Sequence, residues 1–175
     1  MFHDCSDRLF FALRSPQPVA AHIDFERNLL GLRKLVRTEY LHSTLCSFDF
    51  DPLPTWAIPL IQRIGDHVEA QQFWVAWDHL IGSNESVLLK PSRRISAFYD
   101  LRQQLMRYVD RSGLFEKVGR PPEPHLTLAY QRCHGLDQPI DIVSWLVEEL
   151  YLIHSEVGFG LHTVIGCWPL RPRSG

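Results

Sequence analysis

The first half of the chain alternates short apolar runs with amphipathic stretches. Residues 8–13 form a compact apolar run that stops at a Ser-Pro-Gln-Pro segment, which predicts a strand. An imperfect apolar stripe over residues 19–36 predicts a helix, and a second strand is expected at residues 40–48. A loop containing two prolines then leads into a predicted helix over residues 55–71, with Thr55 as its N-cap.

The second half continues with further strands and one strongly amphipathic helix. Apolar residues recur at spacings of three and four from residue 93 to residue 111, with Ser92 as a candidate N-cap and Gly113 as the stop. A proline-rich segment, residues 120–124, is stiff and extended and leads directly into a strand. The strands of this half are expected at residues 73–81, 86–90, 124–131, 142–155 and 161–169.

Helices and strands follow one another without a long break. No linker rich in glycine or serine divides the chain, so independent domains are not expected. The elements fall into two α/β halves, although no residue-by-residue repeat is visible outside the motifs described below. We therefore expect residues 1–175 to form one domain of two pseudo-symmetric lobes.

Composition narrows the functional classes. With 45% hydrophobic residues in 175, the chain can bury a sizeable core, and we expect it to be folded rather than disordered. A formal charge of -2 provides no global basic field for coating a long duplex, so any nucleic-acid contact should be short and local. The four cysteines contain no C-x-x-C pair, which argues against a zinc ribbon or a redox dithiol.

The N-terminus gives an expectation about location. Asp4, Asp7 and Arg8 precede an apolar stretch that is too short for a signal-peptide core or a membrane span. We expect a cytoplasmic protein without a membrane partner.

Two similar polar pairs stand inside apolar runs. They are His42-Ser43-Thr44-Leu45 and His125-Leu126-Thr127-Leu128. Because a strand sends alternate side chains to opposite faces, His and Thr should share one face of each strand while the flanking apolar residues take the other. Either motif alone is compatible with a structural histidine, but the two together indicate a shared functional site.

Two histidines facing one another suit phosphodiester chemistry. One imidazole can remove a proton from the attacking oxygen while the other protonates the departing oxygen. The ordinary pKa of histidine, near 6.5, makes this practicable near neutral pH without a metal. The Thr44 and Thr127 hydroxyls, on the same faces, can donate hydrogen bonds to phosphate oxygens.

At this point the sequence resembles the two-histidine (2H) phosphoesterase superfamily, and within it the RNA 2',3'-cyclic phosphodiesterases, also named 2'-5' RNA ligases (LigT-like). The resemblance spans nearly the whole chain. It is carried by residues 8–13 (RLFFAL), 41–45 (LHSTL), 124–130 (PHLTLAY) and 167–170 (CWPL).

The resemblance implies an α+β class and a bilobal LigT-like fold, with two antiparallel sheets around a central cleft and helices outside. It implies cofactor- and metal-independent opening of an RNA 2',3'-cyclic phosphate to a 2'-phosphomonoester, with reversible 2'-5' ligation chemically allowed. His42 would be the proton donor to the 3' oxygen and His125 the base that activates water, while Thr44 and Thr127 bind phosphate. The expected partner is an RNA 3' end or a cyclic nucleotide, and we expect a monomer.

The chain departs from the family pattern near both motifs. Related sequences often carry an arginine five residues after the second histidine, where this chain has Tyr130. Arg132 keeps the strand parity of that position and is a candidate phosphate-binding substitute. After the first motif, Cys46-Ser47-Phe48-Asp49 replaces the usual basic, aromatic and glycine-containing run. Both departures bear on the identity of the substrate more than on the type of reaction.

Other polar residues have simpler interpretations. We expect the arginines 93, 94 and 120 to be solvated, since isolated surface charges contribute little. Cys133-His134 is interpreted as structural. His154 and His162 lack a threonine two positions on and are left outside the predicted site.

Three alternatives to RNA-end hydrolysis stay open. The first is a binding module that holds a nucleotide or RNA end without turnover, suggested by the arginine missing at Tyr130. The second is a phosphodiesterase of a small cyclic nucleotide. The third, metal ligation by His42 and His125, is disfavoured because no acidic or cysteine ligands accompany them at usual spacings.

Overall fold

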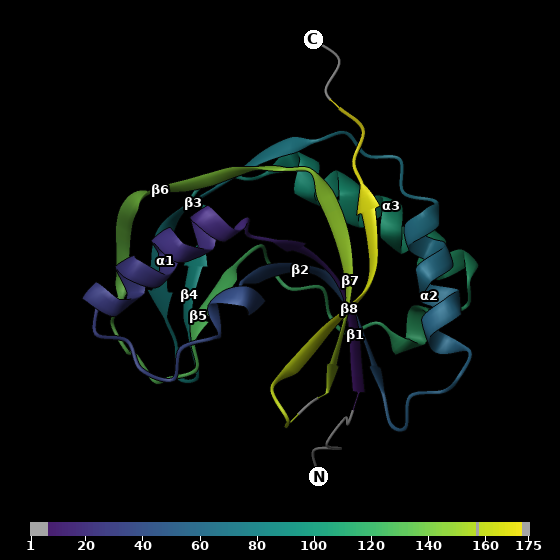
Figure 1. The fold of residues 1–175 in the computed structure, drawn as a ribbon, viewed down its shortest axis with the longest axis horizontal. Helices are drawn as coiled ribbons and strands as arrows, with labels where there is room; N and C mark the ends of the chain where they lie inside the picture. Colours follow the sequence, from purple (N-terminus) through teal and green to yellow (C-terminus); the bar gives the residue numbers. More distant parts are fainter. Residues whose placement is uncertain (1–6, 157, 173–175) are drawn as a thin grey trace.

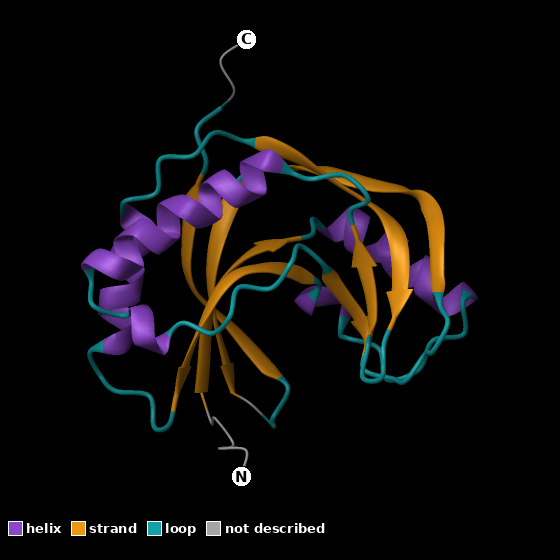
Figure 2. Ribbon diagram, turned by 180° about the vertical axis from the view of Figure 1, so that it is seen from behind, coloured by secondary structure: helices purple, strands orange, loops and turns teal. Residues whose placement is uncertain are grey.

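In a computed structural model of the chain, the described residues form two four-stranded antiparallel sheets and three α-helices (Figures 1 and 2). The structure describes residues 7–156 and 158–172, so most of the N-terminal segment on which the location was argued lies outside it. The elements are β1 (Asp7–Arg14), α1 (Gln17–Leu29), η1 (Thr38–Tyr40), β2 (His42–Phe50), α2 (Ala57–Asp66), β3 (Phe73–Gly82), β4 (Val87–Lys90), α3 (Ser96–Arg111), η2 (Phe115–Lys117), β5 (Leu126–Ala129), β6 (Asp137–Val147), β7 (Glu149–Glu156) and β8 (Leu161–Pro169).

The strand order places both motif strands at sheet edges. One sheet has the order β2-β1-β7-β8, and the other has the order β5-β4-β3-β6. β2 carries the first motif and β5 carries the second. Each is therefore the outer strand of its own sheet, with its free edge available to other parts of the chain.

The helices cover the outer faces of the sheets. In Figure 1, α2 and α3 lie together on one side of the molecule and α1 on the other. α3 buries a stripe at helical spacing, and Gly113 follows it with a φ of 70°, a conformation that glycine adopts without strain. The buried residues of this stripe are Phe98, Leu101, Leu105 and Val109.

Three predicted elements differ from the structure by more than three residues at one end. The predicted strand over residues 142–155 is two strands, β6 and β7, which belong to different sheets, and Figure 1 shows the chain bending from one into the other. The helix predicted to reach residue 36 ends at Leu29, before Gly31, whose φ is 66°. The second predicted helix, over residues 55–71, is shorter and spans Ala57–Asp66. The spacing of apolar residues alone did not predict where these elements end, because apolar residues beyond each end happen to continue the same spacing.

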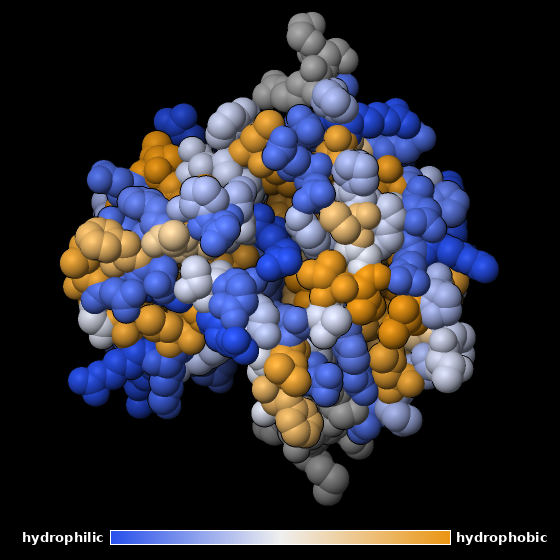
Figure 3. Space-filling view, viewed as in Figure 1, coloured by the Kyte–Doolittle hydropathy of each residue, from blue (hydrophilic) through white to orange (hydrophobic). Residues whose placement is uncertain are grey.

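The surface is mainly polar, with apolar patches. On the face seen in Figure 3, orange side chains gather over α1 and over the β7–β8 region. Exposed large apolar residues of these parts include Phe25, Leu29, Leu161 and Val164. None of the helices formed by the described residues combines the length and apolar character needed to cross a bilayer.

Candidate active site

Both predicted His/Thr pairs line one cavity of about 460 Å³ between the two sheets. His42 and Thr44 come from β2, Thr127 comes from β5, and His125 immediately precedes β5. The other lining residues come from β1, β2, β7, β8 and the segments flanking β5. They are Arg8, Phe10, Ser47, Asp49, Gly119, Arg120, Pro122, Tyr130, Ser155 and His162.

The expected alternation around the motifs is confirmed. Leu41, Ser43 and Leu45 are buried on one side of β2, while His42 and Thr44 are partly exposed on the other. In β5, Leu126 and Leu128 are buried on either side of the partly exposed Thr127. The apolar positions thus fix the face that each strand turns to the core, and the His/Thr pair is left facing the cavity.

A β-bulge lets β2 contribute two further residues to the cavity. In the β1–β2 ladder Phe11 pairs with Cys46 and Ala12 pairs with Thr44, so Leu45 is an extra residue on β2. The alternation changes phase at this point, and Leu45 and Cys46 are both buried. As a result Ser47 and Asp49 face the same cavity as the first motif. Asp49 forms an ion pair with Arg8 of β1 at 2.6 Å.

The two histidine rings are held in the same way. Nδ1 of His42 lies 2.6 Å from the carbonyl oxygen of Tyr40, and Nδ1 of His125 lies 2.7 Å from that of Glu123. Since a carbonyl can only accept, each Nδ1 carries the proton and donates it. In the neutral rings Nε2 is then a free acceptor, which is the atom a general base needs. Both rings are tied to the residue two positions before them.

Burial keeps both imidazoles neutral. It lowers the pKa of His42 from 6.5 to about 4, against the opposing hydrogen bond to Tyr40, with smaller contributions from the positive charge of neighbouring groups. The pKa of His125 is also lowered, chiefly by burial and further by Lys90 and Arg102. A phosphate anion placed between the rings would oppose these effects, because a nearby negative charge favours the protonated form.

A third histidine belongs to this cavity, which the sequence reasoning left out. The ring of His162, on β8, packs edge-on against His42 with centroids 5.5 Å apart, and it stacks on Tyr40 at 4.4 Å. Phe10 completes the group by stacking on His42 at 4.7 Å. The β7–β8 ladder, which pairs His162 with Ser155, brings both residues to the cavity. The absence of a threonine two positions on was therefore the wrong criterion for excluding His162.

The structure places the arginines differently from the positions predicted from the sequence. Arg132 is exposed and does not line the cavity around the two motifs. Arg120, expected to be solvated, and Arg8 of β1 do line it. Tyr130, at the position where related sequences often have arginine, contributes its side chain to the same cavity. The arginines that line the cavity are thus on β1 and in the segment before β5.

Each motif strand is held by the segment that precedes the other motif. On the free edge of β5, Leu35 forms a β-bridge with Ala129, and the Val36 amide donates to the Leu128 carbonyl at 3.0 Å. On the free edge of β2, Val118 forms a β-bridge with Phe48. We call these contacts the two crossed bridges. They connect edge strands that belong to different sheets.

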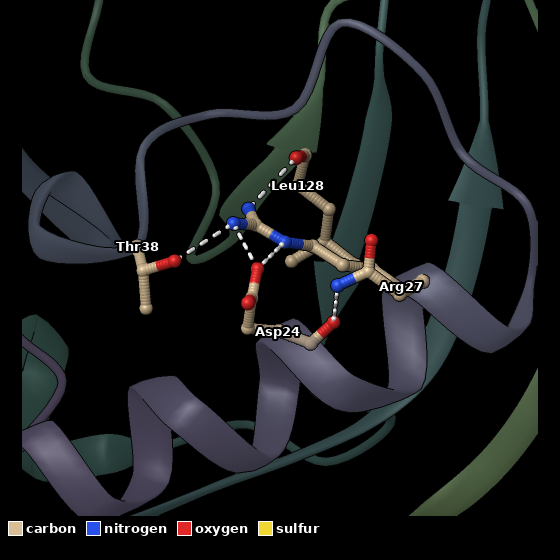
Figure 4. Close-up of polar contacts among 5 residues, drawn as sticks. Asp24, Arg27, Thr38 and Leu128 are labelled. Atoms are coloured by element: carbon tan, nitrogen blue, oxygen red, sulfur yellow. Dashed lines mark hydrogen bonds and ion pairs between the residues drawn. The ribbon is translucent and has the colours of Figure 1, made fainter.

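A buried arginine reinforces the first crossed bridge (Figure 4). Arg27 of α1, whose side chain is 2% exposed, donates through Nη1 to the Leu128 carbonyl and through Nη2 to Thr38 Oγ1. Asp24 neutralises it at 2.6 Å. One guanidinium thus contacts the turn before His42 and the strand after His125, so it fixes the positions of both motifs.

Helix α3 secures the approach to the second motif. Arg102 donates to the Pro122 carbonyl, and the Tyr99 hydroxyl donates to Glu123 Oε2 at 2.7 Å. Glu123 in turn supplies the carbonyl that orients His125. The proline-rich segment is thereby fixed at the residue that holds the ring and at the residue before it.

Comparison with known proteins identifies the fold. Neither a family model nor a curated protein matches the sequence. The apo structure of E. coli LigT matches with a TM-score of 0.79 and 22% identity, covering 94% of this chain and 98% of that chain. A protein of Thermus thermophilus, TT0787, matches with a TM-score of 0.76 and 22% identity, covering 95% and 100%. These likenesses confirm the LigT-like α+β fold expected from the motifs.

A more distant match and several ligand complexes complete the comparison. The MHV ns2 PDE domain matches with a TM-score of 0.52 and 16% identity, covering 80% of this chain and 97% of that chain. E. coli LigT has also been crystallised with 3'-AMP, ATP, NADP+ and phosphate.

Proposed function

We propose that this chain is a two-histidine phosphoesterase that hydrolyses a 2',3'-cyclic phosphate, at an RNA end or on a nucleotide, to the 2'-phosphomonoester. The observation that carries the proposal is the convergence of two His/Thr pairs on one cavity, each imidazole held by the same Nδ1-to-carbonyl bond. The fold shared with solved phosphoesterases supports it, as does the crystallisation of E. coli LigT with nucleotides and phosphate.

In the proposed reaction the two histidines have complementary roles. Nε2 of neutral His125 accepts a proton from water as the water oxygen attacks phosphorus. The bond between phosphorus and the 3' oxygen breaks, and protonated His42 delivers its Nε2 proton to that oxygen. The products are a 3'-hydroxyl and a 2'-phosphomonoester. The Thr44 and Thr127 hydroxyls donate to the non-bridging oxygens, where negative charge accumulates.

His42 must acquire a proton before it can act as the acid. Burial holds the pKa of His42 at about 4, so the ring is neutral at pH 7. The substrate phosphate is anionic and is bound against this ring, which raises the pKa of the imidazole. We therefore expect substrate binding and proton uptake to be coupled.

The proposal is tested by product analysis. The wild type, H42N and H125N are incubated with an oligonucleotide ending in a 2',3'-cyclic phosphate and with 2',3'-cyclic mononucleotides, and products are separated by chromatography. We expect 2'-phosphomonoester from the wild type and a rate loss of about 10²- to 10⁴-fold in each variant. H22N, which alters an exposed histidine of α1, is the matched control and should keep full activity.

Each alternative predicts its own outcome. Retention of the cyclic phosphate with tight binding identifies a binding module and overturns the hydrolase. Turnover of mononucleotides alone identifies a cyclic-nucleotide phosphodiesterase. Loss of turnover in EDTA identifies a metal enzyme. We expect EDTA to have no effect, because the described residues contain no group of three side chains that could together hold a metal ion.

A further inference from the structure

A second chamber opens beside the reaction cavity. It has a volume of about 360 Å³ and shares His42, Thr127 and Tyr130 with that cavity. Arg8, Ser155 and His162 also line both spaces, and the remaining walls come from the segment after α1 and from Glu156, Gly158 and Gly160. A ligand whose phosphate lies between the two histidines therefore has direct access to this chamber, which is of a size typical of small-molecule sites.

The chamber offers one aromatic ring that is free to stack. Tyr40 is already in contact with the His162 ring at 4.4 Å and with the Arg37 guanidinium at 5.0 Å. Tyr130 is 63% exposed, and within residues 7–156 and 158–172 no ring or guanidinium packs on it. The chamber is also lined by the half-buried aliphatic side chains of Leu35 and Val36.

The walls of the chamber are fixed by backbone hydrogen bonds. The Tyr130 amide donates to the Lys34 carbonyl at 3.0 Å, and the first crossed bridge pairs Leu35 with Ala129. The aromatic wall and the aliphatic wall are therefore two sides of one short ladder. A preformed site of this kind binds a flat ligand at a lower entropic cost than a loop that must order on binding.

We propose that this chamber binds the nucleobase of the nucleoside that carries the reacting phosphate, with Tyr130 as its stacking platform. The inference rests on the proposed function and names the part of the substrate that the side chamber recognises. A nucleobase has apolar faces, which match Tyr130 and the aliphatic wall, and a polar edge. Arg37 and Glu156 line the same chamber and supply both a donor and an acceptor for that edge.

The test compares substrates with and without a base. kcat/KM is measured for adenosine 2',3'-cyclic phosphate and for methyl riboside 2',3'-cyclic phosphate with the wild type, Y130A, Y130F and F25A. We expect Y130A to lose roughly 5- to 100-fold on the adenosine substrate, the range for one base-aromatic stack, and to lose much less on the base-free substrate. Y130F keeps the ring and should stay close to the wild type. F25A removes an aromatic of α1 that is 59% exposed and should have no effect.

The same variants are tested by calorimetric binding of 3'-AMP and ribose 3-phosphate. This measurement keeps the two proposals separate, since it does not depend on turnover. Selective weakening of 3'-AMP binding in Y130A supports the nucleobase chamber even if no cyclic phosphate is hydrolysed, an outcome that would refute only the proposed reaction. Equal binding of both ligands by the wild type, or equal weakening of both in Y130A, overturns the chamber assignment while hydrolysis stands.

Discussion

The guanidinium of Arg27 donates a hydrogen bond to the carbonyl of Leu128, 101 positions further along the chain. Leu128 also accepts from the Val36 amide, so its carbonyl joins α1, the loop after α1 and β5 at one point. The first motif begins just beyond that loop and the second motif ends at Leu128. The contact therefore ties together the flanks of two histidines that come from different sheets.

We expect R27M to destabilise the protein by about 3 kcal/mol, because it removes the hydrogen bonds of the buried guanidinium to the Leu128 carbonyl and to Thr38 and breaks its ion pair with Asp24. The midpoint of urea denaturation measures this effect. R107M, which changes an exposed arginine of α3, is the matched control and should lie within about 0.5 kcal/mol of the wild type. A urea midpoint in R27M equal to that of the wild type would show that the contacts of the Arg27 guanidinium do not stabilise the fold.

We expect the optimum of kcat/KM to lie below pH 6.5. An acid-base pair of two histidines is productive when it holds one proton, and that form is most populated between the two pKa values. Burial lowers the pKa of both His42 and His125 below 6.5 in the free protein, which kcat/KM reports, so the maximum shifts toward acid whichever ring is the acid. Bound phosphate raises both values, so the optimum of kcat should lie at higher pH. A kcat/KM optimum above 6.5 would contradict this account.

We expect H162Q to move the acid limb of kcat/KM toward higher pH. His162 faces His42, and its positive charge at low pH is one of the influences that lower the pKa of His42. Glutamine removes the charge and keeps a polar side chain of similar length. The measurement is the pH profile from about pH 3 to about pH 8 on a cyclic nucleotide, a range that covers both the lowered pKa of His42, about 4, and the ordinary pKa of histidine. An unmoved limb with reduced activity at every pH would indicate a packing role alone.

We expect G65A to destabilise the protein by about 1 to 3 kcal/mol through overpacking. An added Cβ on Gly65 would lie 2.4 Å from the ring of Trp168. The Nε1 of this indole donates a hydrogen bond to Asp66, which holds the ring in place. The double variant G65A/W168L frees that space, so the added methyl should cost less in the W168L background. Thermal denaturation of the four proteins measures the difference. Equal costs in both backgrounds would show that the indole is not the obstacle.

The sequence predicted the orientation of the motif side chains correctly where local patterning controls it. Alternation around His42 and around Thr127 was sufficient to predict which side chains face away from the core, because one face of each strand is apolar. The fold class followed from the resemblance and is confirmed by the structural likenesses. The two motif pairs line one cavity because both strands turn their polar faces toward the space between the two sheets.

The remaining residues depend on contacts that are distant in the sequence. The bulge at Leu45 reverses the parity of β2, so Asp49 reaches the cavity although simple alternation from His42 would send it away. His162 reaches the site through strand pairing with β7, which no local pattern encodes. Arg132 kept the right parity, yet β5 ends at Ala129, and beyond the end of a strand parity no longer decides direction.

The crossed bridges connect the two strands that carry the motifs, although these strands belong to different sheets. The strands beside His42 and His125 are outer strands of two different sheets. No β-ladder within one sheet therefore sets the distance between the two histidines. Two loops, residues 30–37 and 118–124, instead connect the strands across the candidate active site and so influence the distance between the two histidines. Insertions, deletions or exchanges in these loops can therefore widen or narrow the site for bulkier or smaller esters while the framework of two sheets is inherited unchanged.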